Sequence, residues 1–415
     1  MKPRLLYVSP VIPFPTGNGR KMRSFFQLQF LRRFFHLTLL VVSIDNDDTK
    51  IKALQLENCC DSFFYVYGPR FTFLGKKTYN FLMRTTGGAI WRFLSSFFEF
   101  SVFEKASPER LVKLLGPVLE ASFDFVQVFR FYMTPVAFAL RQGGIKCPFF
   151  LDMDDFESET RLSIARLYRL NGMIFKSRIM HREAKAYFQA ETEMLPFYDK
   201  IFTCSEMDGR KLEKRFSSLN LAVLPNTVAI PKKISNNPSQ LVCSLFFVGT
   251  MDYFPNFDAL NYFAEWILPE LRKARGIRWK LEIVGMLPRR SWVEKFKKYP
   301  EMRFLGYVED LSAKYSSAHA AIVPIRGGGG TRIKILEAFA HRVPVVSTTI
   351  GISGILAQNG VHAFIADDPV EFAGACVNIF LNSSLAKKIA QNAFELVSEK
   401  YNADNACSVL APVNV

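Results

Sequence analysis

The sequence predicts an α/β protein made of two doubly wound domains with parallel sheets. Three observations predict this class: strand-like runs alternate with longer helical patterns, 415 residues exceed one ordinary core, and a polar stretch at 231–240 interrupts the alternation. We expect an N-terminal domain over 1–232, a linker over 233–242, a C-terminal domain over 243–395, and a tail over 396–415 that packs back on the N-terminal domain. Ligands of such sheets bind at the carboxyl ends of the strands, so a cleft between the domains is expected.

Both halves of the chain show the same βαβ rhythm. The expected helices of the first half are residues 21–34 and the charged stretch 177–195. The strands expected in that half are residues 5–8, 37–42, 125–128, 149–151, 200–203 and 222–224. The strands expected in the second half are residues 245–249, 280–285, 303–305, 320–323 and 344–347.

Composition places the chain among globular proteins and favours an anionic partner. Hydrophobic residues make up 49% of the chain, and the formal net charge is +15. Nucleic acid, acidic lipid and a nucleotide sugar all suit this charge, but the basic residues are scattered and resemble no nucleic-acid module, which argues against nucleic acid. The seven cysteines lack C-x-x-C or metal spacing. We expect a reducing cytoplasm and no disulfide framework or metal.

Two segments bear on membrane contact. The opening residues lead into Pro10, Pro13 and Pro15 without the apolar core of a signal peptide, and no window reaches the roughly 18 apolar residues of a spanning helix. The stretch from Phe63 to Lys105 mixes aromatic and basic residues. An interfacial segment on anionic lipid and an aromatic core with snorkelling cations fit it equally. The protein is expected in the cytoplasm, with peripheral contact to the inner face of the cell membrane.

The most informative stretch is Pro324–Ala340, PIRGGGGTRIKILEAFA. A buried strand should precede it, and apolar residues recur at helical spacing after residue 332, so the glycines lie where a strand passes into a helix. Glycine backbone N–H groups and the positive end of a helix dipole favour an anion there. Arg332 and Lys334 add full charges, and Glu337, one turn later, suits the hydroxyls of a ribose.

Each of these residues also has a structural interpretation. The glycines fit an ordinary turn equally well. The two cations could be solvated, although a helix N-terminus disfavours positive charge. An unpaired Glu337 among apolar neighbours is costly, so either a ligand or Lys334, three residues away, should compensate its charge.

With these features in place, the chain resembles the GT-B glycosyltransferases, and most of all glycosyltransferase family 4. The strongest match is residues 328–340 followed by Val343–Ser347 and Gly351, which is similar to the donor-binding signature of the family. Weaker matches lie at residues 202–205, 224–228, 246–250 and 304–307. The resemblance implies a sugar nucleotide held by the C-terminal domain, an acceptor held by the N-terminal domain, and transfer that usually retains anomeric configuration.

The resemblance also assigns roles. Glu337 matches the ribose-binding glutamate of the family. The matching loop beside the diphosphate comprises Gly328, Gly329, Gly330 and Thr331, with Arg332 and Lys334 as phosphate partners. Gly17 and Gly19, just before the first helix, resemble the N-terminal glycine loop that faces the donor, although an ordinary turn fits them too.

Two positions depart from the family pattern. Eight residues before Glu337 the family often has a second glutamate, and here Gly329 occupies that place. The family also carries an arginine and a lysine soon after the first strand of its second domain, whereas residues 249–256 contain neither. Arg332 and Lys334 are expected to replace them.

An acidic cluster follows the strand expected at 149–151. Asp152 and Asp154 should reach the cleft, where either could orient the acceptor hydroxyl or accept its proton. Capping of the next helix by Asp154 or Asp155 is the alternative. The D-x-D spacing lacks companion ligands, so no metal site is expected.

The helix that carries Glu337 should end near His341. This histidine is expected to have a structural role at the helix end. Arg342 replaces a glycine of the family, so the turn there should be strained.

The expected function is therefore transfer of a sugar from a nucleotide-diphosphate sugar to a saccharide or lipid-linked acceptor in surface polysaccharide biosynthesis. No cofactor or essential metal is expected, since the donor is a substrate. The alternatives are a GT-B epimerase or hydrolase, a silent partner of a polysaccharide complex, and a non-catalytic nucleotide- or nucleic-acid-binding protein.

Overall fold

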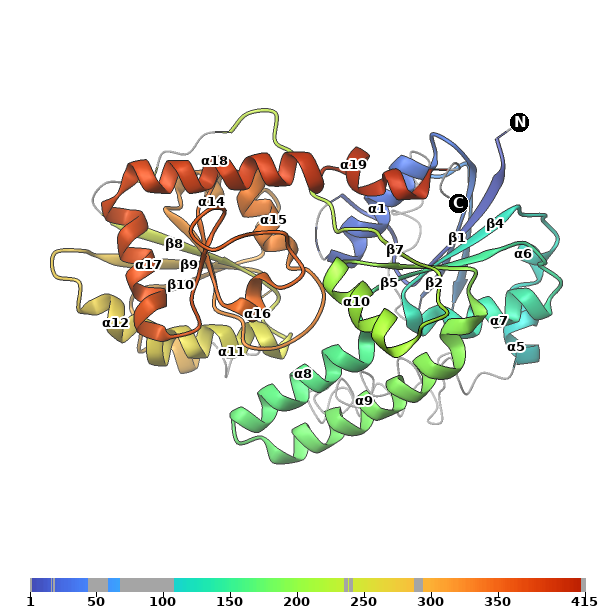
Figure 1. The fold of residues 1–415 in the computed structure, drawn as a ribbon, viewed down its shortest axis with the longest axis horizontal. Coiled ribbons are helices and arrows are strands. Elements are labelled where there is room, and N and C mark those ends of the chain that lie inside the picture. The colour runs from blue at the N-terminus through green and yellow to red at the C-terminus, as the bar shows by residue number, and fades with distance from the viewer. Residues whose placement is uncertain are drawn as a thin grey trace.

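The computed structural model shows two α/β domains, each built on one parallel sheet (Figure 1). It describes residues 2–15, 17, 19–43, 59–67, 108–234, 238, 242–286 and 294–411. In Figure 1 the N-terminal domain lies on the right and the C-terminal domain on the left. The fold class expected from the sequence is confirmed.

The N-terminal sheet has seven parallel strands in the order β3-β2-β1-β4-β5-β6-β7. Its strands are β1 Arg4–Ser9, β2 His36–Ser43, β3 Ser62–Tyr67, β4 Phe125–Phe129, β5 Phe149–Asp154, β6 Lys200–Thr203 and β7 Leu221–Val223. Alternate residues of β1 enter two different cores: Leu6 and Val8 pack on one face of the sheet, and Leu5 and Tyr7 on the other. A sheet covered on both faces explains the nearly continuous apolar runs in the sequence.

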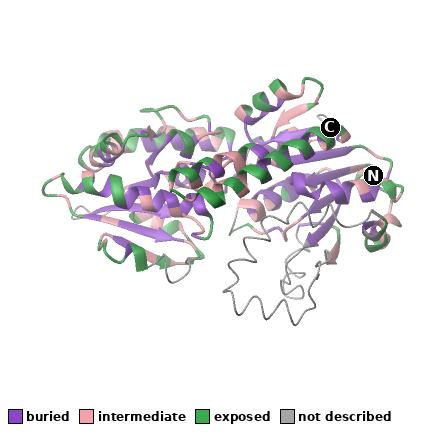
Figure 2. Cartoon of the chain, turned by 90° about the horizontal axis from the view of Figure 1, so that it is seen from below, coloured by how far each residue is buried: buried purple, intermediate pink, exposed green. Residues whose placement is uncertain are grey.

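Helices cover both faces of this sheet. They are α1 Gly19–Leu31, α5 Pro108–Leu114, α6 Gly116–Leu119, α7 Thr134–Gln142, α8 Glu157–Leu170, α9 Ile174–Met194 and α10 Glu206–Arg215, with 3₁₀ turns η1 Phe131–Met133 and η2 Leu195–Phe197. Figure 2 shows the strands of both sheets as mostly buried ribbon, while exposed residues gather on the helices.

The C-terminal sheet has six parallel strands in the order β10-β9-β8-β11-β12-β13. They are β8 Cys243–Val248, β9 Trp279–Val284, β10 Met302–Gly306, β11 Ala320–Val323, β12 Val345–Ser347 and β13 Phe364–Ile365. The helices are α11 Phe254–Tyr262, π-helical η3 Phe263–Ile267, α12 Leu268–Arg272, α14 Ser312–Ser317, α15 Ile333–Ala340, α16 Thr349–Ile352, α17 Pro369–Leu381 and α18 Ser383–Lys400.

The end of the chain returns to the N-terminal domain. After α18, the short helix α19, Ala403–Cys407, contacts α1, and the 3₁₀ turn η4, Ser408–Leu410, follows it. Cys407 and Leu410 are buried in the N-terminal core that contains Leu5 and Tyr7. Figure 1 shows α18 passing along the top of the molecule toward that domain. Two connections therefore join the domains: the segment after β7 and this crossing.

The structure describes only the first residues of the aromatic segment at 63–105, and it assigns them to the sheet. Its first residues, Phe63–Tyr67, belong to β3, which pairs with β2, so they form an edge strand of the sheet. The remainder of the segment, residues 68–105, falls outside the described residues. No described helix is long and apolar enough to cross a bilayer. Where Arg342 replaces glycine, the expected strain is confirmed by a φ of 54°.

Candidate active site

The glycine-rich stretch connects β11 to α15, as the sequence predicts. Gly328 and Gly330 have φ angles of 104° and 68°, a backbone region that side chains disfavour. The helix begins after Arg332, which makes no side-chain cap. The free N–H groups of a first turn bind anions readily, because the dipole adds positive charge there.

Arg332 lies at the opening of this helix and is buried. One guanidinium nitrogen, Nη1, donates to the carbonyls of Gly329 and Gly330, at 2.8 Å for Gly329. The other, Nη2, is buried without a hydrogen-bond partner among the described residues. A buried unpaired donor of a charged group is costly, so Nη2 points to an anionic ligand.

Glu337 lies one turn further along α15 and is half-buried. Its Oε2 accepts a hydrogen bond from the Tyr315 hydroxyl at 3.2 Å. Among the residues the structure describes, no cation lies within ion-pair distance of this carboxylate, and Lys334 is not its partner. Burial raises the pKa of Glu337 to about 7, which the Tyr315 hydrogen bond and the Lys334 charge partly oppose. The carboxylate therefore remains open to hydroxyl donors.

Lys334 points to the loop after β8. Its Nζ donates to Asn256 Oδ1 at 2.9 Å and lies 4.2 Å from the centre of the Phe247 ring. A Cβ on Gly249 would stand 2.9 Å from the same nitrogen. The cation missing from residues 249–256 is thus supplied from α15. Burial lowers the pKa of Lys334 to about 7, with the nearby Arg332 charge acting in the same direction.

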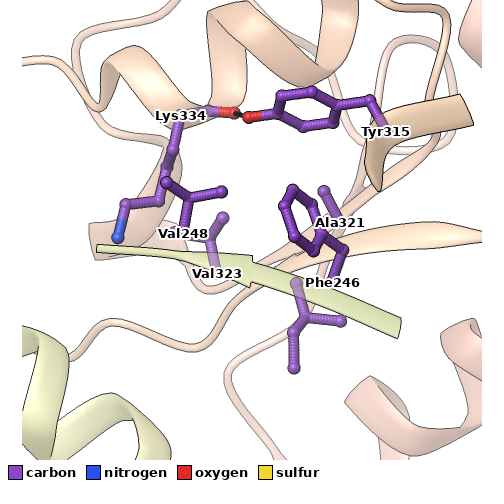
Figure 3. Close-up of a pocket in the computed structure, with 7 residues that line it drawn as sticks. Phe246, Val248, Tyr315, Ala321, Val323 and Lys334 are labelled. Atoms are coloured by element: carbon purple, nitrogen blue, oxygen red, sulfur yellow. Dashed lines mark hydrogen bonds between the residues drawn. The ribbon is translucent and has the colours of Figure 1, made fainter. Parts of the chain in front are cut away.

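A narrow pocket lies between Lys334 and the tyrosine that binds Glu337. Figure 3 shows the Lys334 side chain and the Tyr315 ring on either side of it, with Val248 of β8 and Val323 of β11 between them. The pocket is too narrow for a water molecule in this conformation. It lies inside the C-terminal domain, and Glu337 is not among the residues that line it.

The N-terminal glycine loop lies against the start of α15. A Cβ on Gly19 would meet Ile333 Cδ1, in the first turn of α15, at 2.9 Å. Gly17 is exposed, with a φ of 107°. Thr331 accepts a short hydrogen bond from Asn226 Nδ2, in the segment after β7. Gly19 and Thr331 therefore lie at the start of α15 with the glycine-rich loop, whereas a Cβ on Gly17 would meet nothing within 4 Å.

Helix α8 also touches the glycine-rich loop. Gly328 N donates to Ser163 Oγ at 3.0 Å, and a Cβ on Gly329 would lie 1.7 Å from Thr160 Oγ1. In this conformation no side chain fits at position 329. The close approach of α8 accounts physically for the glycine where the family often has a glutamate.

The acidic residues of β5 separate into two environments. Asp152 is 0% exposed, and its carboxylate accepts from Arg23 at 2.7 and 2.8 Å and from Gln27 at 2.6 Å. These donors fill the carboxylate, so in this conformation it anchors α1 to β5 and cannot reach a substrate hydroxyl. Arg23 also donates to Asn226 Oδ1 at 3.1 Å, which links this cluster to the Thr331 contact.

Asp154 lies nearer the cleft and is held in strain, with a φ of 57°. Arg130, at the end of β4 with a φ of 79°, bonds to it at 2.6 Å and to Asp155 at 2.9 Å. Burial raises the pKa of Asp154 to about 6 against the opposing charges of Arg130 and Arg23. The expected helix capping is wrong: α8 begins after Phe156 without a side-chain cap, because both carboxylates bind Arg130.

Asp155 faces the glycine-rich loop. A Cβ on Gly330 would lie 2.1 Å from its Oδ1. Burial acts to raise its pKa, but the charges of Arg130 and then Arg332 outweigh burial and lower it. An ionised carboxylate therefore lies beside the loop expected to bind phosphate.

Sequence reasoning missed the residues that connect these parts. Arg23 and Arg130 are cations within otherwise ordinary stretches, and Tyr315 gives no motif. Asn226 lies in the 224–228 segment that the resemblance did single out, and Asn256 in the loop noted for its missing cations. The described residues contain no cluster of metal-ligating side chains. His341 stacks on Tyr315 with ring centroids 4.6 Å apart, at the end of the helix.

Comparisons with known proteins agree with this arrangement. Residues 243–382 match the model of a family described as glycosyl transferases group 1. An uncharacterized 44.6 kDa protein in the cps region of Klebsiella pneumoniae is 23% identical over 420 residues, covering 99% of this chain and 100% of that protein.

Solved structures share the fold over almost the whole chain. Sucrose-phosphate synthase from Thermosynechococcus elongatus has a TM-score of 0.68 at 13% identity, covering 99% of this chain and 97% of that one. HepE from Anabaena, in complex with UDP and glucose, has a TM-score of 0.64 at 13% identity, covering 99% and 98%. The fold is GT-B, and the family match supports a group 1 glycosyltransferase.

Proposed function

We propose that the protein transfers a sugar from a nucleotide-diphosphate sugar to a saccharide or lipid-linked acceptor, with retention, as a family 4 type hexosyltransferase. The observation that carries this proposal is the set of groups around the start of α15. Open helix N–H groups, the unpaired Arg332 Nη2 and the Lys334 ammonium suit a diphosphate, and Glu337 suits a ribose. The structure of HepE with UDP and glucose supports a nucleotide donor in this fold.

The positions of these groups around the two sheets support the same proposal. The strand order reverses between β1 and β4 in one sheet and between β8 and β11 in the other. Gly17, Gly19 and Arg130 follow β1 and β4, while Gly249 and the glycine-rich loop follow β8 and β11. Ligands of doubly wound sheets bind at such reversals.

In the proposed reaction, the acceptor oxygen forms a bond to the anomeric carbon as the bond to the donor phosphate breaks. Negative charge then builds on the departing nucleoside diphosphate, where Arg332, Lys334 and the helix N–H groups stabilise it. The acceptor proton passes to the leaving phosphate or to Asp154. Asp154 fits better than Asp152, because its carboxylate is partly exposed and its pKa is raised to about 6.

Surface polysaccharide biosynthesis, on the cytoplasmic side of the membrane, is the proposed setting. The relative named for the cps region supports this setting. No resident cofactor or essential metal is proposed. An epimerase or hydrolase would use the same nucleotide site, but no feature of the site favours either.

The first experiment is a thermal-shift screen with UDP-, GDP- and ADP-sugars. A true donor should raise the unfolding temperature by mass action. Turnover of that donor should then fall at least tenfold in Arg332→Ala, because a charge on the leaving diphosphate loses its partner.

Arg332→Lys serves as the control, since it keeps the charge but loses the planar fork, and should retain part of the activity. Near-normal transfer by a folded Arg332→Ala protein would refute the assigned role. Release of free sugar without any acceptor product would indicate the hydrolase instead.

A further inference from the structure

Helices α8 and α9 form a long hairpin, and Figure 1 shows the two lying side by side at the lower edge of the molecule. The chain reverses at Gly172, which has a φ of 70°. At 21 residues, α9 is about 30 Å long. Its far end is anchored where the buried Glu191 pairs with Arg215 of α10 at 3.0 Å. At the near end Asn171 donates to Asp258 of α11 at 2.7 Å, so the available part of the tip is its exposed side chains.

The tip presents large apolar side chains to solvent. Leu170 is 71% exposed, Ile174 48% and Phe175 72%. They lie within six residues of one another, on the two sides of the turn. Clustered exposed apolar side chains of this size on a soluble surface indicate a contact site.

Cations surround these apolar residues. The exposed basic residues of the hairpin are Arg166, Arg169, Lys176, Arg178, Arg182 and Lys185. None of them makes an ion pair with a described residue. The only carboxylate between residues 160 and 190 is Glu183, which is buried 3.4 Å from Arg161. The exposed charge of this region is therefore positive throughout.

We propose that the hairpin tip docks on an anionic lipid bilayer. Leu170, Ile174 and Phe175 would enter the boundary between headgroups and acyl chains, while the surrounding cations bind lipid phosphates. A second copy of the chain does not fit this surface, because it would bring six further cations against the first six. Charge complementarity selects a negatively charged surface, and the apolar tip selects one with a hydrophobic interior.

The same helix connects this surface to the cleft. Besides Thr160 and Ser163 at the glycine-rich loop, α8 carries Tyr168, whose ring stacks on Phe254 of α11 with centroids 4.1 Å apart. A docked hairpin would hold the cleft close to the lipid surface, where a lipid-linked acceptor is available. That link rests on the proposed function, whereas docking itself requires no transfer reaction.

The test is co-sedimentation with vesicles of phosphatidylglycerol mixed with phosphatidylcholine, compared with phosphatidylcholine alone. The full-length protein should bind the anionic vesicles and release at high salt. Arg178→Glu/Arg182→Glu should weaken binding at least tenfold, and Leu170→Ala/Phe175→Ala should weaken it without changing its salt dependence.

The matched controls lie on α18, at the top of Figure 1, and at the last residue of α17. Lys387→Glu/Lys388→Glu makes the same charge change on α18, and Leu381→Ala removes a leucine that is 69% exposed. Both should bind as the unaltered protein does. The proposal would be overturned if hairpin and control variants lost vesicle binding equally, or if the unaltered protein did not bind the anionic vesicles. It would also be overturned if the hairpin variants kept vesicle binding and lost only self-association or retention on RNA.

Stabilisation by the nucleotide sugar, measured without vesicles, separates this proposal from the proposed function. The hairpin variants should keep that stabilisation. If the protein binds vesicles through the hairpin but binds no nucleotide sugar, the docking proposal stands and the proposed transferase function is refuted.

Discussion

At the scale of single residues, the proposed donor site depends on two groups whose charges are costly in the free protein. Burial moves the pKa of Lys334 down and that of Glu337 up, both to about 7. Each deviation means that the charged form lacks full compensation in the absence of ligand. A diphosphate beside the ammonium and ribose hydroxyls beside the carboxylate would supply what is missing.

The Lys334 charge predicts a pH dependence of donor binding. Lys334 is charged below its pKa of about 7, so donor binding above that pH must include uptake of a proton. The contribution of this ammonium to affinity should therefore fall roughly tenfold per pH unit above 7. Binding of the nucleotide sugar to the unaltered protein and to Lys334→Met, measured by calorimetry from pH 6 to 8.5, checks this.

The variant should bind much more weakly than the unaltered protein at pH 6, and the gap should narrow as pH rises. Lys280→Met, at a partly exposed lysine paired with Glu282, is the control and should leave the profile unchanged. A gap that stays constant across this range would show that Lys334 does not titrate at the donor.

At the scale of elements, the glycine-rich loop and α8 are fitted to each other. Gly329 has no room for a Cβ because Thr160 stands in that space, and its φ lies outside the left-handed region. Gly329→Ala should therefore lower the unfolding free energy by about 1–3 kcal/mol through overpacking alone. Thermal and denaturant unfolding measure this effect.

A second substitution identifies the cause. Thr160→Gly removes the clashing atoms at a helix cost of about 1 kcal/mol, and should recover part of the loss in the double variant. Gly330→Ala should not be rescued in this way, because Gly330 has a φ of 68°. If the effects of Gly329→Ala and Thr160→Gly simply add, the contact between loop and helix contributes nothing.

Most strands and helices could be predicted from the sequence, but some could not. Strand 320–323 was predicted with its observed bounds, since a buried parallel strand has a continuous apolar pattern, and α15 followed from helical spacing. The strand at Ser62–Tyr67 was not predicted, and the helix α8 was expected after Asp155 without bounds. The first lies in a segment for which an interfacial role and an aromatic core were both left open, and the second has no side-chain N-cap to mark its start.

The site shows the same limit. A local motif located Arg332, Lys334 and Glu337, because one helix end carries all three. Arg23 and Arg130 act through partners that lie 129 and 24 positions away, at Asp152 and Asp154, and no spacing rule connects such residues. For the same reason the sequence did not show that hydrogen bonds from Arg23 and Gln27 already fill the Asp152 carboxylate.

At the scale of the whole molecule, the two domains are in direct contact around the start of α15, where Gly19 packs on Ile333 and Asn226 donates to Thr331. Besides the contacts of α8 with the glycine-rich loop, Asn171 donates to Asp258 of α11 at 2.7 Å. The segment after β7 and the crossing between α18 and α19 are the two connections about which the domains could move. Because α8 packs directly on the glycine-rich loop, the proposed donor would need a more open arrangement to reach that loop.

An equilibrium between closed and open arrangements predicts that weakening the closure favours binding. Apparent affinity is the intrinsic affinity reduced by the fraction of molecules that can bind. Asn171→Ala removes one hydrogen bond of the closed contact, which is worth about 0.5–1.5 kcal/mol, so donor affinity should rise about two- to tenfold while the unfolding temperature falls slightly. Calorimetric titration with the nucleotide sugar measures the first effect.

Asn392→Ala is the matched control, because Asn392 donates to Val361 within one domain at 3.0 Å. This variant should lower stability without raising donor affinity. A weaker donor affinity in Asn171→Ala would instead assign the closed contacts to the donor-bound state, since a contact that the ligand needs cannot be removed at a gain.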